Sequence, residues 1–189
     1  MIVATPYTSL ALVLMLLLLP LDWLFAAVTA GAVHELCHIL CVKFCGGTVD
    51  SVSFSANGCE ICCSALPYWN QILCILAGPL GSLSLMSVSG VFQKIAVCGL
   101  IHGVYNLLPV RPLDGGRLLD LVLYRICPSH ADGMLKLIQI GTLTGILLLS
   151  LAACFLWNLG TEILFCWILL FIKLFPRKTP CKPFKIGVQ

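Results

Sequence analysis

Two histidines and a glutamate fall within five residues of one apolar stretch, at His34, Glu35 and His38. Residues four apart lie on the same face of an α-helix, so both imidazoles can bind one metal ion. Glu35 then lies beside that ion, where it can take a proton from an attacking water. The alternative is a pair of buried histidines hydrogen-bonded in a helix bundle, at a high cost for ionisable groups inside a membrane. The spacing therefore predicts a metal-dependent hydrolytic centre.

A catalytic zinc site keeps three protein ligands and leaves one position for water, so a third ligand is required. The prolines and glycines of residues 106–117 interrupt an apolar stretch and disfavour a continuous helix there. Broken backbone at membrane depth is tolerated where it is buried in protein or lines a watery cavity. Asp114 lies at this break, as a third ligand or as the cap of a helix restarting at Gly115. Spacing alone leaves both roles open.

The composition indicates an integral membrane protein. Of the 189 residues, 60% are hydrophobic and only 10% are charged, with a net charge of +3. A water-soluble domain of this size needs more charge on its surface, and disorder needs lower hydrophobicity. The weak positive charge gives no reason to expect nucleic acid as a partner. The twelve cysteines are scattered, mostly through apolar segments, so a disulfide framework is not expected. Cys37, Cys41 and Cys45 recur every four residues along one helix stripe, and small apolar packing is expected of them.

The elements that must position these residues are membrane helices. We expect an all-α polytopic membrane protein, one membrane-embedded domain over 1–189 with a core at 21–125, a basic tail at 176–189 and no soluble domain. Six segments match the length of a spanning helix, the fourth of them broken: 7–19, 21–44, 67–90, 93–125, 133–157 and 158–175.

The distribution of cations sets the orientation of these spans. With both termini in the cytoplasm, Lys94 is the one outward cation among the 11 Lys and Arg residues, as the positive-inside rule requires. No Lys or Arg precedes Lys43, and another apolar segment follows the first, so a cleaved signal peptide is not expected. We therefore expect a multi-pass protein of the cell membrane.

A small β-hairpin is expected at the cytoplasmic face, within residues 46–66. Residues 48–54 alternate between polar and apolar types, Asn57-Gly58 is typical of a tight turn, and 59–65 can return as a second strand.

The chain resembles the site-2 protease family of zinc intramembrane proteases. The resemblance rests on three blocks in order, at residues 34–38, 77–81 and 106–117, and with the span order it covers about 21–125. It is closest to the bacterial branch that includes the sporulation protease processing a sigma-factor precursor. Pairing of the first block with the Pro-Leu-Asp-Gly-Gly run in a broken membrane helix makes the resemblance specific.

The resemblance implies that His34, His38 and Asp114 bind Zn²⁺ and that Glu35 is the general base. It places Asn106 where the family has an Asn that helps to hold substrate or to polarise the scissile carbonyl. The implied activity is hydrolysis of a peptide bond in a membrane-embedded or membrane-associated protein, as in regulated intramembrane proteolysis. A regulatory membrane partner fits this activity, with the active site opening to the cytoplasm.

Two alternatives from other classes remain, a metal-binding or metal-transport membrane protein and an inactive scaffold homologue. A transporter would need the ligands but not Glu35.

Several other residues carry weaker signals. Cys37 stands where the family usually has Gly, and its thiol lies one turn from His34, within reach of the metal. Ser82 lies near a position at which many relatives carry Asn. His102 is expected to be a packed histidine, and the Cys59/Cys62 pair is a weak indication of a metal or redox site.

Overall fold

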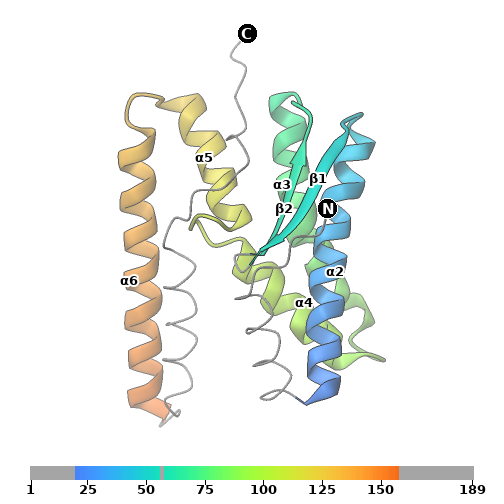
Figure 1. Ribbon diagram of the computed structural model, residues 1–189. Helices are drawn as coiled ribbons and strands as arrows, with labels where there is room; N and C mark the ends of the chain where they lie inside the picture. The colour runs from blue at the N-terminus through green and yellow to red at the C-terminus, as the bar shows by residue number, and fades with distance from the viewer. Residues whose placement is uncertain (1–19, 56–57, 158–189) are drawn as a thin grey trace. The chain divides into compact units, whose positions relative to one another are not determined.

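The computed structural model describes residues 20–55 and 58–157 (Figure 1). The expected spans at 7–19 and 158–175 and the basic tail lie outside the described residues. Among the described residues, the chain divides into two compact units, and the boundary falls between Leu107 and Leu108.

In the part of the first unit that the structure describes, three α-helices form the framework. They are α2 (Leu21–Phe44), α3 (Tyr68–Ser84), which continues into the short 3-10 helix η1 (Leu85–Val88), and α4 (Gln93–Asn106). The segments Leu21–Phe44 and Tyr68–Val88 are each long and apolar enough to cross a membrane. The spans expected at 21–44 and 67–90 are therefore confirmed as helices of spanning length. Figure 1 shows α2 and α3 running side by side in opposite directions.

The buried face of α2 is small and partly polar. Ala26, Ala30 and His34 follow one another at intervals of four and are buried, so they form one stripe along the helix. Large apolar side chains such as Phe25 and Leu36 are exposed. This distribution suits a helix whose outer face contacts lipid, because small residues let membrane helices approach closely.

The contact between α3 and α4 depends on two glycines four residues apart in α4. A Cβ atom at Gly99 would lie 2.6 Å from the carbonyl oxygen of Ser82, and one at Gly103 would lie 3.1 Å from that of Pro79. The two helices therefore approach backbone to backbone, as small-xxx-small sequences allow. This close approach brings the α4 side chain between the glycines, His102, to α2.

An ion pair lies at one end of this unit. Lys94, in the first turn of α4, donates to the Asp22 carboxylate in the first turn of α2, and its ammonium group also lies 5.5 Å from the ring centroid of Trp23. The N-terminal ends of α2 and α4 thus lie at the same end of the unit. This end contains Lys94, the one cation that the sequence predicted to be on the outward side.

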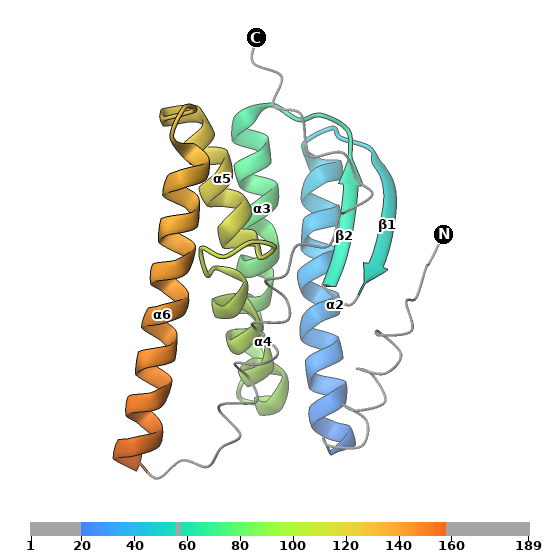
Figure 2. The same cartoon turned by 60° about the vertical axis from the view of Figure 1, so that its left-hand side comes forward.

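The expected hairpin is present as β1 (Val49–Ser55) and β2 (Gly58–Cys63), antiparallel, with Val52 opposite Ile61. The expected position of the turn was wrong by one residue, because Gly58 already pairs with Ser55 as the first residue of β2. Both strands contact α2, and Figure 2 shows the hairpin lying along that helix.

The second unit contains α5 (Asp114–Ile126) and α6 (Ala131–Trp157), which pack together through Leu123, Ala131 and Leu135. The segment Ala131–Leu156 is the third described helix with the length and hydropathy of a membrane span. The expected break in the fourth span is confirmed, since α4 ends at Asn106 and helical structure resumes at Asp114. The total of six spans stays a prediction.

Candidate metal centre

The two histidines of α2 point their Nε2 atoms at each other. These atoms are 3.1 Å apart. His34 is buried, with only 3% of its surface exposed. The pairing follows from the four-residue spacing on one helix face that the sequence predicted. At this separation the two nitrogens can share one hydrogen bond, or both can bind one metal ion.

The other ring nitrogen of each histidine is held by α3. His38 donates its Nδ1 hydrogen to the carbonyl oxygen of Cys74 at 2.7 Å, and the Nδ1 atom of His34 lies 3.0 Å from the hydroxyl of Ser82. A carbonyl can only accept, so the neutral His38 ring carries its hydrogen on Nδ1 and presents a bare lone pair on Nε2. Metal-binding histidines are oriented in the same way, by a second partner on the distal nitrogen.

The geometry of the pair fits a zinc ion. Two nitrogens at about 2.0 Å from one tetrahedral zinc lie about 3.3 Å apart, close to the observed separation of the Nε2 atoms. The Ser82 hydroxyl can either donate or accept, so His34 can shift its hydrogen to Nδ1 and present a second lone pair. The imidazole nitrogens are ligands that zinc prefers.

A stripe of small residues on α3 makes room for these rings. Cys74, Gly78 and Ser82 recur every four residues and are buried against α2. A Cβ atom at Gly78 would lie 2.2 Å from the Nε2 atom of His38, so only glycine leaves space for that imidazole. The roles of Ser82 and of the Cys74 carbonyl were not predicted from the sequence. The four-residue spacing around Gly78 was the available signal.

We expect Ser82→Ala to lower zinc affinity about 10- to 100-fold, because His34 loses the partner that orients its ring. Equilibrium competition against a chelator, followed by metal analysis, measures this change. The control is Ser84→Ala on the same helix, whose hydroxyl bonds to the carbonyl of Gly81. Equal affinities for the two variants would contradict a positioning role for Ser82.

One further side chain contacts the histidine pair directly, and two others adjoin the residues involved. Glu35 follows His34 directly and is half-buried. The ring of His102 packs edge-on against that of His34, with centroids 4.7 Å apart. The Asn106 amide donates to the carbonyl oxygen of His102 at 3.0 Å, which uses one of its two N–H hydrogens. His102 is packed as expected, but against a histidine of the site.

Cys37 packs against Gly81 of α3. A Cβ atom at Gly81 would lie 2.2 Å from its Sγ atom, so the thiol points into the contact between α2 and α3. Elsewhere in the described chain, Cys62 of β2, which belongs to the pair that weakly indicated a metal or redox site, is disulfide-bonded.

Asp114 belongs to the second unit, where it is the first residue of α5. The N-cap residue of α5 is Leu113, so Asp114 is not the residue that caps this helix. Its carboxylate Oδ1 lies 3.9 Å from the Nη1 atom of Arg117, one turn along α5. A Cβ atom at Gly116 would lie 2.5 Å from the carbonyl carbon of Val110. The preceding loop therefore folds directly onto the first turn of the helix.

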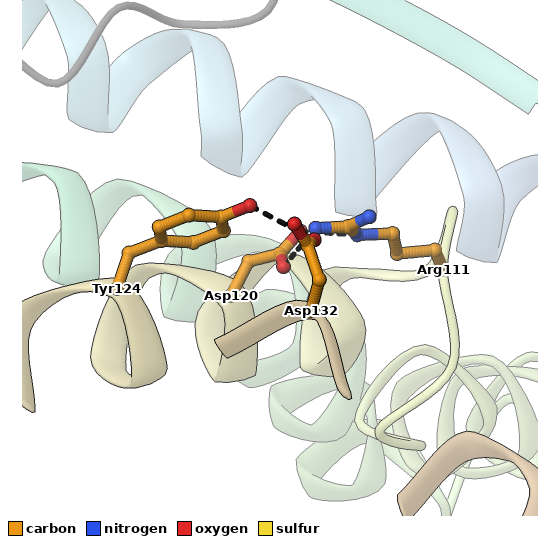
Figure 3. Close-up of polar contacts among 4 residues, drawn as sticks. All are labelled: Arg111, Asp120, Tyr124 and Asp132. Atoms are coloured by element: carbon orange, nitrogen blue, oxygen red, sulfur yellow. Dashed lines mark hydrogen bonds and ion pairs between the residues drawn. The ribbon is translucent and has the colours of Figure 1, made fainter. Parts of the chain in front are cut away.

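Polar contacts anchor this loop to α5 (Figure 3). Arg111 donates from Nε and Nη2 to the two carboxylate oxygens of Asp120, an arrangement that fixes direction as well as distance. Tyr124 donates to Oδ1 of Asp132 at 2.8 Å, which joins α5 to the first turn of α6. The loop before Asp114 is thus tied to α5, and α5 in turn is tied to α6.

The comparison with known protein families gives a match over the middle of the chain. Residues 70–151 match the sequence model of peptidase family M50, the site-2 protease family. The resemblance to that family is confirmed. The M50 match includes Ser82, Asn106 and Asp114, and it begins after the His34–His38 pair. No curated protein sequence matches the chain.

The fold agrees with this family. The structure is similar to the site-2 protease from Methanocaldococcus jannaschii, with a TM-score of 0.61 and 18% sequence identity over 93% of this chain and 89% of that one. At this identity the similarity concerns the fold. The M50 match and the three helices of spanning length support a membrane metalloprotease.

Proposed function

We propose that the protein is a zinc-dependent endopeptidase that hydrolyses a peptide bond of a membrane-embedded or membrane-associated protein. The observation that carries this proposal is the His34/His38 pair, with both distal nitrogens held by α3 and Glu35 beside it on a helix of spanning length. The M50 match supports it independently, since it concerns a later part of the chain.

In this proposal, His34, His38 and Asp114 hold the zinc ion. A catalytic site of two histidines and a carboxylate leaves the fourth position open. When bound, zinc polarises the scissile carbonyl and makes an attacking water more acidic. The Asp114 carboxylate comes from the first residue of α5, directly after a loop that the Arg111–Asp120 contact ties to the same helix, and such bracing preserves a ligand's direction.

Glu35 is the general base in this proposal. It accepts the proton of the attacking water and then delivers it to the leaving amine. Asn106, at the end of α4, has an amide hydrogen beyond the one donated to His102, and that hydrogen can hold the substrate backbone. His34 lies ten residues before Phe44, the end of α2, or about 15 Å along the helix. In the proposed topology this end of α2 faces the cytoplasm, so water enters the site from the cytoplasmic side.

The substrate must be extended at its cut site, because a helix hides its peptide bonds in internal hydrogen bonds. The β1–β2 hairpin lies along α2 and has only two strands in the described chain. An extended peptide can add to such a sheet through main-chain hydrogen bonds. We propose that the hairpin holds the substrate in this way.

Replacement of Val52 by proline is expected to reduce cleavage several-fold at an unchanged zinc content. Proline removes a main-chain donor and disfavours the strand. Gel analysis of a labelled single-span peptide in proteoliposomes measures cleavage, and Val52→Ala, which keeps the N–H, is the control. Unchanged cleavage by the proline variant would exclude strand addition at β1.

The ligand set is tested by the zinc content of the detergent-purified protein. We expect about one zinc per chain in the wild type, none in His34→Ala and weakened binding in Asp114→Asn, as befits loss of one of three ligands. Zinc that survives Asp114→Asn unweakened would place the third ligand elsewhere. A folded wild-type protein without zinc affinity would overturn the protease proposal.

Topology in the cell membrane, with both termini cytoplasmic, is part of the same proposal.

A further inference from the structure

A second group of metal-binding side chains lies in the first unit, apart from the histidine pair. The Sγ atoms of Cys41, Cys45 and Cys74 all lie within 4.8 Å of one another. Cys41 and Cys45 are four residues apart at the end of α2, and Cys74 faces them from α3. Three thiols from two different helices thus converge on one point.

The surroundings of these thiols are apolar. Cys74 is buried in a cluster with Val42 and Leu66, and Cys41 and Cys45 pack against that cluster. Apolar packing alone accounts for one or two cysteines, which behave as small hydrophobic residues. Mutual convergence of three sulfurs is the arrangement that a thiophilic ion requires.

The distances allow coordination after a small inward movement. Three sulfurs at about 2.3 Å from one ion lie about 4 Å apart. This separation is slightly shorter than 4.8 Å, the distance within which the three Sγ atoms lie. Rotation about χ1 of a cysteine moves its sulfur far enough to close this difference. Cys41 and Cys45 are only partly buried, so an ion can reach them.

The ligand set selects the ion. Thiolates favour soft ions such as Cu⁺ and Zn²⁺, but structural zinc sites are almost always four-coordinate. Cys63 packs against the same cluster, but its sulfur is not one of the three that lie close to one another. Three converging sulfurs therefore suit Cu⁺ better than Zn²⁺, because a structural zinc site requires a fourth ligand.

We propose that Cys41, Cys45 and Cys74 form a second metal site that binds one Cu⁺ ion and ties the end of α2 to α3. The thiol protons go to water on binding, and the ion enters already reduced, so no electron is transferred. The site shares a residue with the histidine pair, since the carbonyl of Cys74 accepts from His38. Occupancy therefore also fixes the peptide that orients His38.

The test is anaerobic titration of the detergent-purified full chain with Cu⁺ in the presence of a competing Cu⁺ chelator. We expect one Cu⁺ per chain to survive competition in the wild type, with three sulfur neighbours by X-ray absorption. Cys41→Ser, Cys45→Ser and Cys74→Ser should each lose it. The control is Cys98→Ser on α4, a half-buried free cysteine outside the group, which should retain it.

Two further measurements keep the outcome interpretable. Zinc content at the histidine pair shows that the Cys41 and Cys45 serine variants are folded, and Cys45→Ala repeats the test at the C-cap of α2. Retention of Cu⁺ by the Cys41 or Cys45 variants, or no retention in the wild type, would overturn the site and leave apolar packing. Zinc bound through these cysteines in a parallel titration would overturn the assignment to copper. His34→Ala should keep its Cu⁺, so this result is independent of the protease proposal.

Discussion

Glu35→Gln is expected to lower peptide-bond hydrolysis about 10²- to 10⁴-fold, the contribution of a general base, while zinc content stays at the wild-type level. Glutamine matches the size of glutamate but cannot take a proton from water at neutral pH. His34 and His38 keep their contacts with Ser82 and Cys74 in this variant. Cleavage of labelled single-span peptides in proteoliposomes and metal analysis of the same preparation measure both quantities.

The matched control is Asp22→Asn, which removes a carboxylate from the first turn of the same helix, where it pairs with Lys94. This exposed ion pair is distant in sequence from the histidines and contributes little. A metal transporter or an inactive scaffold would respond alike to both substitutions. Equal activities of the two variants would therefore show that Glu35 is not the general base.

Gly78→Ala is the second substitution with a large expected effect. Its Cβ atom would lie 2.2 Å from the Nε2 atom of His38, closer than any non-bonded contact allows. Either the imidazole leaves its position or α3 moves away from α2. We expect loss of zinc binding, and destabilisation of at least about 1–3 kcal/mol, typical of an overpacked core. Metal analysis and thermal unfolding in detergent measure the two effects.

Gly31→Ala provides the control on α2, because no atom outside its own helix lies within 4 Å of the added Cβ. Alanine is also the better helix former, by about 1 kcal/mol, so this variant should be at least as stable as the wild type. Wild-type zinc binding and stability in Gly78→Ala would contradict the close contact between α2 and α3.

The sequence predicted the elements in which a single periodicity dominates. The extents of α2 and α3 follow from uninterrupted apolar runs, and the hairpin follows from strict alternation. The break after Asn106 follows from prolines and glycines, whose backbone restrictions are local. The histidine spacing likewise fixes one shared helix face without any knowledge of the fold.

Features that depend on the meeting of two helices could not be predicted in this way. The roles of Ser82 and of the Cys74 carbonyl arise because α3 lies against the histidine face of α2. Periodicity defines the faces of a helix but not which neighbour each face meets. The packing of His102 on His34 depends in the same way on the glycines of α4.

The two anchors of the histidine pair differ in how evolution can alter them. The Ser82 anchor is a side chain, so a single nucleotide change can abolish it. The His38 anchor is the carbonyl of Cys74, which every amino acid supplies. The His38 contact therefore places no selection on the residue type at position 74 beyond its size. A thiol can be gained or lost there as a separate trait, while the orientation of the neighbouring imidazole is inherited unchanged.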